Sequence, residues 1–262
     1  MSKILLIDGD FILWKTVPIS ALSETEKMYG VSNEKSLEDI QEHIDWYLEN
    51  KIFIPTGCKD YLAFLGGKGN FRKEINTGYK ENRKDIEYPD YFSEAKQYLI
   101  DKYDFHPIDN IEAEDAIGIC IDYFPNNIIV REDHDLNQLP GVHYNPTKEK
   151  FKEISFKDAQ YYKYYQCLTG CTSDKVVGIK GIGDAKAKKL LAGISTDYLL
   201  FKVIEEYYKK YKHEGLQKFE ENYKLLHILR TLDNLKDAGL EKIIEDKLQF
   251  INKQSEDLNF DL

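Results

Sequence analysis

The sequence predicts an α/β fold, in which a parallel sheet is flanked by helices and followed by a helical C-terminal region. Three short apolar runs have the length and continuity of buried strands: residues 3–7, 61–65 and 127–130. Helical patterns separate these runs, and strands that alternate with helices are typical of a parallel sheet between two helical layers. After Asn145-Pro146 we expect few strands. The chain therefore divides into an α/β core, residues 1–147, and a helical region, residues 148–262.

The individual elements follow from their apolar spacing. The first run, Lys3-Ile-Leu-Leu-Ile7, is continuous and ends at Asp8, which is the pattern of a fully buried strand before a turn. Apolar residues recur at helical spacing in several segments, namely residues 36–53, 91–103, 113–123 and 157–169. Glycines punctuate residues 176–191, and the remainder to about residue 250 again has a helical pattern.

The composition is that of a folded, acidic protein. The 262 residues carry 36 Lys and Arg against 46 Asp and Glu, a formal net charge of −10, and 42% of them are hydrophobic, which excludes a disordered chain. The apolar runs are far shorter than the roughly 20 residues of a membrane span, and no signal-peptide pattern precedes the first strand. We therefore expect a cytoplasmic protein without a membrane partner. The acidic balance excludes nucleic-acid binding over the whole surface but leaves room for local basic sites.

The cysteines are few and mostly far apart in the chain. They are Cys58, Cys120, Cys167 and Cys171. This number does not form the dense disulfide framework of a small secreted domain. One CxxxC spacing without a second pair of cysteines or histidines is a weak zinc signal. We interpret all four as reduced thiols.

Acidic residues gather at the carboxyl ends of the predicted strands. They are Asp8, the group Glu112, Glu114 and Asp115, and the pair Asp133 and Asp135. Ligands of a parallel α/β sheet bind beyond the carboxyl ends of its strands, so we expect these groups at one edge. Clustered carboxylates repel one another unless a cation neutralises them, and hard oxygen ligands suit Mg²⁺ or Mn²⁺. The hypothesis is a metal site. The alternatives are favourable charges at a helix N-terminus for 112–115 and solvated turn residues for 133–135.

The segment Val177-Gly-Ile-Lys-Gly-Ile-Gly-Asp-Ala-Lys-Ala-Lys-Lys-Leu-Leu191 has the pattern of a helix-hairpin-helix over about residues 176–192. Gly181 and Gly183 permit a tight hairpin and expose backbone N–H groups to a phosphate, with Lys186 and Lys188 close behind. Such a hairpin holds a nucleic-acid backbone without reading the base sequence. The alternative is a glycine-rich loop between packed helices. A dinucleotide-binding loop is disfavoured, because we expect the glycines after a helix rather than after a buried strand.

Two basic islands interrupt the acidic sequence. Residues 175–189 hold five Lys against one Asp, and residues 68–84 hold six Lys or Arg against two Glu, so each has a net charge of +4. The second island contains Tyr79, Lys80 and Arg83. Aromatic rings among cations suit an unpaired strand, whose bases stack and whose phosphates pair with the cations. A salt-bridged surface helix is the alternative for this island.

Several motifs occur in a characteristic order along the chain. They are Asp8 after an apolar strand, Gly-Tyr-Lys-Glu-Asn-Arg (78–83), Glu-Ala-Glu-Asp (112–115), Glu-Asp-His-Asp-Leu-Asn-Gln-Leu (132–139) and Thr-Ser-Asp-Lys-Val-Val-Gly-Ile-Lys-Gly-Ile-Gly (172–183). In this order they resemble the bacteriophage and bacterial 5′ nucleases, a family of flap endonucleases and 5′→3′ exonucleases. The resemblance covers about residues 3–192. It implies a PIN-like α/β core, two divalent metal ions, a helical arch over the active site within about residues 66–90, and a helix-hairpin-helix that holds duplex DNA, often with a bound K⁺.

The resemblance also implies roles for particular residues. The first metal region is implied to be served by Asp8, Glu112, Glu114 and Asp115. The second is implied to be served by Asp133, Asp135 and Asp174. Lys80 and Arg83 match basic residues at the foot of the arch that contact the scissile phosphate, and Tyr79 matches a residue that stacks on the terminal nucleotide.

The chain departs from the family pattern where two carboxylates are usual. After the second strand, where the family has an Asp, the chain reads Leu65-Gly66-Gly67-Lys68. In the late motif Cys171 stands where the family has Asp, and Lys175 replaces an Asn. Glu114 also replaces the usual Asp, which lengthens that side chain by one methylene. Fewer carboxylates weaken the binding of divalent ions, and a cysteine is a poor Mg²⁺ ligand that tolerates softer metals.

The sequence thus predicts a metal-dependent phosphodiesterase that cuts DNA, or the RNA of an RNA–DNA primer, near a 5′ end or flap. Its expected setting is phage or bacterial replication, with replication proteins as partners. One alternative is a catalytically weakened homologue that binds branched DNA structurally, which the glycine and cysteine replacements favour. A second is a PIN-type ribonuclease without preference for DNA structure, against which the helix-hairpin-helix argues.

Overall fold

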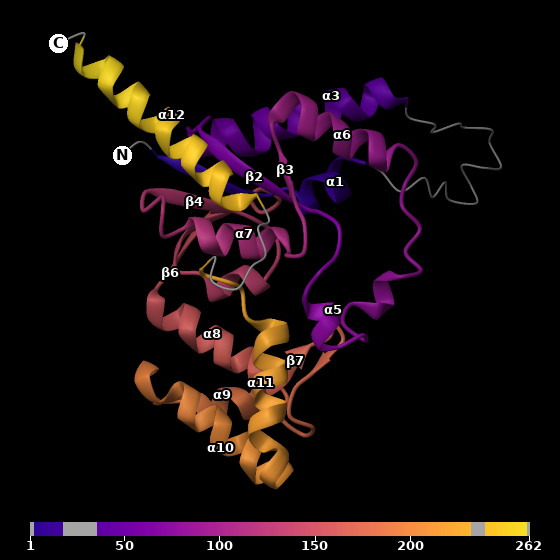
Figure 1. The fold of residues 1–262 in the computed structure, drawn as a ribbon, viewed down its shortest axis with the longest axis vertical. Coiled ribbons are helices and arrows are strands. Elements are labelled where there is room, and N and C mark those ends of the chain that lie inside the picture. The colour runs from indigo at the N-terminus through magenta and orange to yellow at the C-terminus, as the bar shows by residue number, and fades with distance from the viewer. Residues whose placement is uncertain (1–2, 18–35, 232–238, 261–262) are drawn as a thin grey trace.

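The computed structural model describes residues 3–17, 36–231 and 239–260. An α/β part with a central sheet lies above a smaller helical part in the view of Figure 1. After the second strand the chain runs from the sheet down to the helical part and then returns to the α/β part (Figure 1). The chain thus passes between the two parts more than once, whereas the predicted division at residue 147 implies a single connection.

The central sheet has six strands in the order β3-β2-β1-β4-β5-β6. Their bounds are β1 (Ile4–Asp8), β2 (Tyr61–Gly66), β3 (His106–Ile108), β4 (Asn127–Val130), β5 (Gly141–Asn145) and β6 (Lys150–Ile154). All neighbouring pairs are parallel except β5 and β6, which form an antiparallel hairpin. Ile7 lies opposite Ala63 of β2 and Val130 of β4, so the carboxyl ends of these three strands meet at one edge of the sheet.

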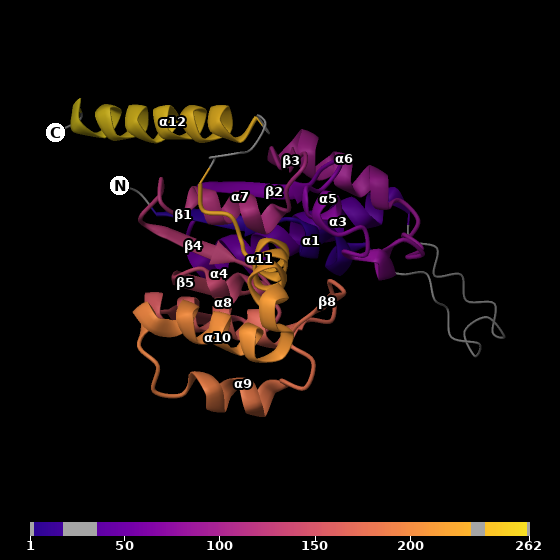
Figure 2. The ribbon, with the colours of Figure 1, turned by 60° about the horizontal axis from the view of Figure 1, so that its bottom comes forward.

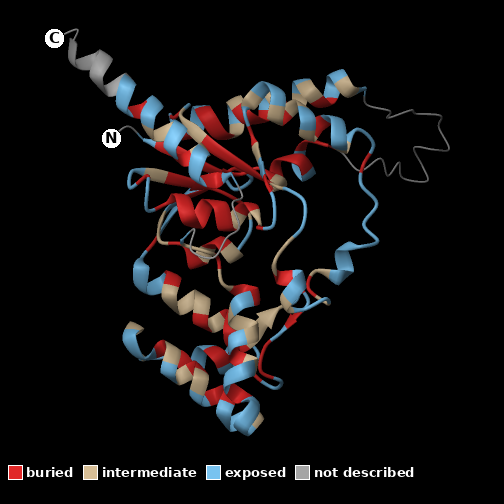
Figure 3. Ribbon diagram, in the orientation of Figure 1, coloured by how far each residue is buried: buried red, intermediate tan, exposed pale blue. Residues whose placement is uncertain are grey.

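Helices cover both faces of the sheet and enclose alternate side chains of β1. On one face Leu5 and Ile7 share a buried cluster with α1 (Asp10–Thr16), α3 (Leu37–Tyr47) and α6 (Phe92–Tyr103). On the other face Ile4 and Leu6 share a second cluster with α7 (Ala113–Cys120) and α12 (Leu240–Phe260). A π-helical turn η1 (Leu48–Phe53) and the short α4 (Ile54–Thr56) lead from α3 towards β2. Figure 3 shows the central strands as almost wholly buried, as a sheet covered on both faces requires.

The helical part has a core of its own. Its elements are α8 (Phe156–Thr169), α9 (Asp184–Leu191), η4 (Thr196–Tyr198), α10 (Leu199–Tyr211), η5 (Lys212–Glu214) and α11 (Gly215–Leu226). Leu168, Ile179 and Tyr207 are among the residues buried between them. Helix α12 lies apart from α8, α9 and α10, with the sheet between them (Figure 2), and its Ile244 and Ile251 pack into the core of the α/β part. The C-terminal region predicted as one helical unit is therefore divided between both parts.

The predicted fold class and the three predicted strands are confirmed as a parallel sheet flanked by helices. The predicted helices at 91–103, 113–123 and 157–169 correspond to α6, α7 and α8, and the helix at 36–53 continues as a π-helical turn after Tyr47. Few strands follow Asn145-Pro146, as expected; they are two strands of two residues each and the edge strand β6, which the sequence did not indicate. This edge strand has no apolar run, because its residues face solvent along most of its length. None of the helices in the described ranges has both the length and the apolar composition of a membrane span.

The segment 66–90, where the family resemblance implies a helical arch, has little helix. It contains a four-residue helix, α5 (Arg72–Ile75), and one 3-10 turn, η2 (Glu81–Arg83), and the rest is turn or extended chain. Glycines at 66, 67, 69 and 78 disfavour a long helix here. In Figure 1 the segment reaches α5 beside β7 (Gly170–Cys171) before it returns to α6. We call residues 66–90 the arch segment.

Candidate active site

A cavity of about 420 Å³ opens at the carboxyl ends of β1, β2 and β4. Its acidic lining residues are Asp8, Asp10, Glu112, Glu114, Glu132 and Asp133. The wall also includes Lys80 and Arg83 from the arch segment, and Phe11 and Trp14 from α1. We call it the acidic cavity. It brings together four of the seven predicted metal ligands, namely Asp8, Glu112, Glu114 and Asp133.

Two aspartates stand where β1 turns into α1. Asp8 ends the buried strand, and its Oδ1 accepts a hydrogen bond from the backbone N of Asp10 at 3.1 Å. The carboxylate of Asp10 in turn accepts from the backbone N of Gly66, at 3.1 and 3.2 Å. A Cβ on Gly66 would lie 3.1 Å from Oδ2 of Asp10. Asp10 therefore places a carboxylate at the carboxyl end of β2, where the chain itself has glycines instead of the expected aspartate.

Glu112 and Glu114 enter the cavity from the start of α7. Glu112 precedes the helix and accepts hydrogen bonds from Asn70 Nδ2 at 2.9 Å, from Tyr79 Oη and from Lys80 Nζ. Burial would raise the pKa of Glu112, but the ion pairs with Lys80 and Arg72 outweigh it and lower the pKa. This carboxylate is therefore ionised and held in place by the arch segment.

In contrast to Glu112, Asp8 and Glu114 have raised pKa values. Burial, and then repulsion from Asp10, raises the pKa of Asp8 well above its usual value. Burial, and then repulsion from Asp8 and Glu112, does the same to the pKa of Glu114. Lys80 compensates these two charges only in part, and a divalent ion would stabilise the remaining negative charge. The oxygen donors of the acidic cavity thus fit Mg²⁺ or Mn²⁺.

Lys80 links the acidic cavity to a second group of possible ligands. Its Nζ pairs with Glu112 and lies 3.6 Å from Asp174 Oδ1, and its backbone N donates to Asp174 O at 2.9 Å. Burial would lower the pKa of Lys80, but Glu112, Glu114 and Asp174 raise it, so Nζ keeps its proton. Arg83 donates to the same Asp174 Oδ1 at 3.1 Å. Both predicted basic residues therefore lie beside carboxylates of the site.

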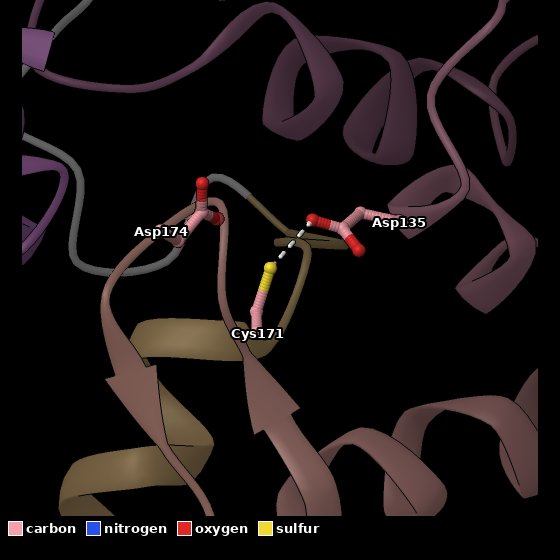
Figure 4. A group of neighbouring side chains, drawn as sticks. All are labelled: Asp135, Cys171 and Asp174. Carbon is pink, nitrogen blue, oxygen red and sulfur yellow. Dashed lines mark hydrogen bonds between the residues drawn. The ribbon is translucent and has the colours of Figure 1, made fainter. Parts of the chain in front are cut away.

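The second group consists of Asp135, Cys171 and Asp174, with one ligand atom of each within 4.8 Å of the others. Figure 4 shows the Cys171 side chain directed at Asp135, to which Sγ donates at 3.7 Å. Burial, and then repulsion from Asp133 and Asp174, raises the pKa of Asp135 to about 6, and burial raises the pKa of the Cys171 thiol to about 11. Two carboxylates and one thiol are a poor set for Mg²⁺, and the sulfur is better tolerated by a softer divalent ion. Asp135 and Asp174 are absent from the lining of the acidic cavity.

Asp115, predicted as a metal ligand, has a different role in the structure. It is fully buried, and its two oxygens accept from Arg72 Nη1 and Nη2 at 2.5 and 2.8 Å. Leu229 N also donates to Asp115 at 3.0 Å, while Arg72 donates to the carbonyls of Leu225 and His227. This carboxylate is saturated by protein donors and anchors α5 of the arch segment to α7 and to the chain after α11. The prediction that it serves a metal ion is therefore not supported.

Tyr79 is likewise not free to stack on a nucleotide. Its ring is 2% exposed and packs with Val176, Leu225 and Leu226. Its hydroxyl lies within hydrogen-bonding distance of Glu112 and of Asp174, at 3.2 Å from an oxygen of each. Burial, and then these two carboxylates, raises the pKa of the phenol, so it stays a donor. In this structure Tyr79 holds carboxylates of both ligand groups in place.

The glycine-rich segment forms a turn before α9, but its surroundings differ from the expectation. It follows β8 (Val176–Val177), a two-residue strand paired with β7, and not a helix. Gly181 has a φ of +92°, which favours glycine, whereas Gly183 has ordinary extended backbone. Gly178 is required for a close approach, because a Cβ there would lie 2.4 Å from the backbone N of Gly170. The turn leads into α9, on which Lys186 and Lys188 are exposed.

Sequence reasoning missed Asp10 and did not anticipate the ion pair between Arg72 and Asp115. The signal for Asp10 was its position two residues after Asp8, on a turn that leaves a buried strand. Cys171 was identified as a departure from the family pattern, but the structure shows that its sulfur lies beside two carboxylates. No sequence signal identified Arg72 as buried, because its partner lies 43 residues away.

The chain is similar in sequence to a known flap endonuclease and to part of a DNA polymerase. No family model matches the sequence. Flap endonuclease Xni of Shewanella pealeana is 24% identical over 268 residues, which cover 92% of this chain and 98% of that protein. DNA polymerase I of Caldicellulosiruptor bescii is 27% identical over 220 residues, which cover 74% of this chain and 25% of the polymerase. The matching part thus spans about a quarter of that polymerase but nearly the whole of the flap endonuclease.

Solved structures of a bacteriophage nuclease share the fold. The T5 D15 protein co-crystallised with metal ions has a TM-score of 0.65 and 14% identity, and the match covers 95% of this chain and 99% of that one. T5 5′-exonuclease with bound zinc ions has a TM-score of 0.62 and 16% identity, with 95% and 99% covered. These likenesses establish the fold. Together with the named sequence relatives, they confirm the resemblance to 5′ nucleases that the motifs indicated.

Proposed function

We propose that the protein is a metal-dependent 5′ nuclease that hydrolyses phosphodiester bonds in DNA with 5′ ends or flaps. The observation that carries the proposal is the convergence of Asp8, Glu112, Glu114 and Asp133 on one cavity that also contains Lys80. The sequence relatives named flap endonuclease and the shared fold of the T5 nuclease support it. RNA–DNA primers as substrates, a role in phage or bacterial replication in the cytoplasm, and replication proteins as partners belong to the same proposal.

Two donor sets hold the divalent ions in this proposal. The acidic cavity supplies Asp8, Asp10, Glu112, Glu114 and Asp133. The second set is Asp135, Cys171 and Asp174. Divalent ions bound by these residues supply polarisation of the phosphate and a water molecule of lowered pKa. The carboxylates of the first set suit Mg²⁺ or Mn²⁺, and the thiol of the second set favours an ion softer than Mg²⁺.

The chain's own cations would bind the phosphate. Lys80 Nζ is protonated and cannot act as a general base, so its contribution is charge. Arg83 adds a planar group with several donors, which suits phosphate oxygens. Donors fixed beside a phosphate stabilise the negative charge that develops on it and on the leaving oxygen. The hydroxyl of Tyr79 would hold the carboxylates of Glu112 and Asp174 beside these cations.

The turn before α9 would hold the duplex part of the substrate. Gly181 and Gly183 leave open space around the backbone at this turn, since a Cβ on either would meet nothing within 4 Å. The turn precedes exposed Lys186 and Lys188. An uncrowded helix start followed by lysines suits a phosphate backbone. We include a K⁺ ion at this turn in the proposal.

Cleavage of a labelled 5′-flap duplex in Mg²⁺ and in Mn²⁺ tests the function. We expect cleavage near the flap junction, and loss of at least 100-fold in rate for Asp133→Ala, since electrostatic groups of an active site contribute on that order. Glu153→Ala is the matched control, because Glu153 is an exposed acid on β6. No cleavage in either metal, together with tight flap binding, would refute the enzyme and favour a structural DNA-binding homologue.

That second candidate is favoured by two observations on this chain. Gly66 ends β2 and Gly67 follows it, where a carboxylate is expected, and Cys171 replaces another. Asp10 lies at the first of these positions, and Cys171 with its neighbours retains a donor set at the second. These contacts favour the enzyme over the weakened homologue. Equal cleavage of linear single-stranded RNA and flap DNA would instead favour a PIN-type ribonuclease.

A further inference from the structure

Two buried glutamines connect the second donor set, Asp135, Cys171 and Asp174, to the backbone that follows α11. Gln166 of α8 donates from Nε2 to Asp135 Oδ1. Gln138, at the end of the 3-10 turn η3 (Asp135–Gln138), donates from Nε2 to Gln166 Oε1 at 2.7 Å. Each glutamine is 4% exposed. We call Gln138 and Gln166 the amide relay.

The directions of the hydrogen bonds in the amide relay are fixed at both ends. The backbone O of Leu226 accepts from Gln138 Nε2 at 2.7 Å, and the backbone N of Ile228 donates to Gln138 Oε1 at 3.4 Å. A carbonyl can only accept and a backbone N–H can only donate, so the Gln138 amide has a single orientation. Gln166 must then accept with its Oε1, and its Nε2 is turned to the carboxylate of Asp135.

The backbone that holds the amide relay is itself tied to buried side chains. Along residues 225–229 the even-numbered residues contact Gln138, and the odd-numbered residues contact Arg72 or Asp115. Arg72 and Asp115 form a buried ion pair that anchors the arch segment. All five residues therefore have a backbone group bonded to a buried side chain. The relay thus holds Asp135 against a well-anchored part of the molecule.

Gln166 occupies one oxygen of Asp135 and leaves the other to the second donor set. Oδ1 accepts from Gln166, whereas Oδ2 lies 3.7 Å from Cys171 Sγ. An amide orients a carboxylate without neutralising its charge, whereas a lysine or arginine at this position would compete with a divalent ion. Asp135 therefore keeps its negative charge for an ion and presents a defined oxygen to it.

Packing of α8 against η3 does not by itself require these two amides. Burying an amide costs free energy unless it is hydrogen-bonded, and apolar side chains of the same size would fill the space without that cost. The hydrogen bonds that offset the cost here run from one anchored backbone segment to one carboxylate. The arrangement therefore points to a role at the carboxylate on which the amide relay ends.

We propose that Gln166 and Gln138 are positioning residues, which hold the Asp135 carboxylate in the orientation that an ion in the second donor set requires. The proposal rests on the proposed function, since it takes Asp135 to be a metal ligand. Gln166 acts on Asp135 directly, and Gln138 acts through Gln166. Hydrogen-bond partners that orient a metal ligand contribute about 10- to 100-fold to metal affinity.

A double-mutant cycle between Gln166 and Asp135 separates positioning from packing. Gln166→Met keeps the approximate size of the side chain and removes both hydrogen bonds, while Asp135→Asn removes the charge that an ion would need. Calorimetric titration with Mn²⁺ measures metal affinity in the native protein, both single variants and the double variant, and circular dichroism in EDTA measures Tm. Gln160→Met is the matched control, because Gln160 lies on the same helix outside the amide relay. Gln138→Met tests the second link and serves if Gln166→Met does not fold.

We expect Gln166→Met to weaken Mn²⁺ binding by about 10- to 100-fold in the native background and by less than about 2-fold in Asp135→Asn, where no charged ligand remains to be oriented. Gln138→Met should weaken Mn²⁺ binding in the same way but less, and Gln160→Met should leave it unchanged. Flap cleavage by Gln166→Met should recover as the Mn²⁺ concentration is raised, because the variant loses metal affinity and no group that contacts DNA.

Equal losses of Mn²⁺ affinity in the two backgrounds would overturn the proposal. So would native affinity in both glutamine variants, or unchanged Mn²⁺ binding in Asp135→Asn. The calorimetric readout does not depend on cleavage. A coupled loss of Mn²⁺ affinity in a protein that does not cut flap DNA would therefore refute only the nuclease, whereas flap cleavage with additive losses would refute only the positioning.

Discussion

Replacing Asp115 by Asn removes one charge from a buried ion pair without changing the size of the side chain. In the native protein Arg72 donates to both oxygens of Asp115, and the two side chains are 3% and 0% exposed. In the variant the guanidinium keeps its charge, because its pKa lies far above neutrality. It would then be buried with the carbonyls of Leu225 and His227, a neutral amide and, at 3.9 Å, the carboxylate of Glu112 as partners. The structure thus predicts a large loss of stability and no direct loss of a metal ligand.

The size of the effect follows from the burial of both partners. Breaking a buried ion pair by removing one charge costs about 3–5 kcal/mol. A chain of this length loses about 2–4 °C in Tm per kcal/mol, so we expect Tm to fall by about 10 °C. Thermal and urea unfolding in EDTA, followed by far-UV circular dichroism, measure the loss. Calorimetric titration with Mn²⁺, at a temperature where the variant is folded, measures metal binding separately.

Glu114→Gln is the matched control for this experiment. Burial, and then repulsion from Asp8, raises the pKa of Glu114, so a neutral amide relieves a cost in the metal-free protein. We expect this variant to keep or raise Tm in EDTA and to bind Mn²⁺ more weakly. The opposite pattern for Asp115→Asn, with native Tm in EDTA and lost Mn²⁺ binding, would show that Asp115 is a metal ligand and that the assignment to Arg72 is wrong.

Three further predictions concern acid stability, metal choice and DNA binding. Burial, and then repulsion from Arg131, lowers the pKa of His143 to about 3, below its unfolded value of about 6.5. Between these two values the unfolded chain binds more protons than the folded chain, so the free energy of unfolding decreases as the pH is lowered. The free energy of unfolding of His143→Gln should therefore fall by about 1.6 kcal/mol less than that of the native protein between pH 6.5 and 5, measured by urea unfolding, and equal losses would contradict this. Cys171→Asp should tighten Mg²⁺ binding more than Mn²⁺ binding in calorimetry, whereas a uniform change would show that the sulfur is no ligand. Charge reversal at Lys186 and Lys188 should weaken duplex binding at low salt and reduce the slope of log K against log salt by about 2, and unchanged binding would count against the turn before α9.

Fully buried strands could be predicted from the sequence, whereas strands at the edges of the sheet could not. Strands β1, β2 and β4 are continuous apolar runs, because helices cover both faces of the sheet at these positions. Strand β3 has three residues, and β6 faces solvent along most of its length, so neither leaves an apolar run to recognise. Helix α12 packs on the α/β part, away from the other C-terminal helices, and the spacing of apolar residues does not indicate which partner a helix packs against.

The site was predictable to the extent that a strand end determines where a side chain points. Asp8 ends one buried parallel strand, Asp133 follows another, and both line the cavity. Asp115 belongs to the same motif as Glu112 and Glu114, but helical geometry turns it towards α5, where Arg72 neutralises it. A motif gives the residue type at each position, whereas the partner of each carboxylate depends on a contact between segments far apart in the chain.

The two basic islands have the same net charge in the sequence, but they differ in the structure in how many of their cations are paired with acids. The cations at 68–84 are largely engaged by neighbouring acids, since Arg72 pairs with Asp115, Lys80 with Glu112, Arg83 with Asp174 and Lys84 with Glu81. Such pairs leave little net field at a distance, so this island acts at close range on a phosphate that has already entered the cavity.

The lysines at 175–189 have a different setting. All five are exposed, and Asp184 is the only acid within the segment. Its pair with Lys188 is a surface contact at 2.8 Å, which has little energy in water. The long-range attraction of duplex DNA should therefore come from the island before and within α9, while the arch segment supplies local contacts. Charge reversal at exposed Lys73, on α5, should accordingly change the salt dependence of duplex binding by no more than one phosphate contact, about half the change expected for Lys186 and Lys188 together.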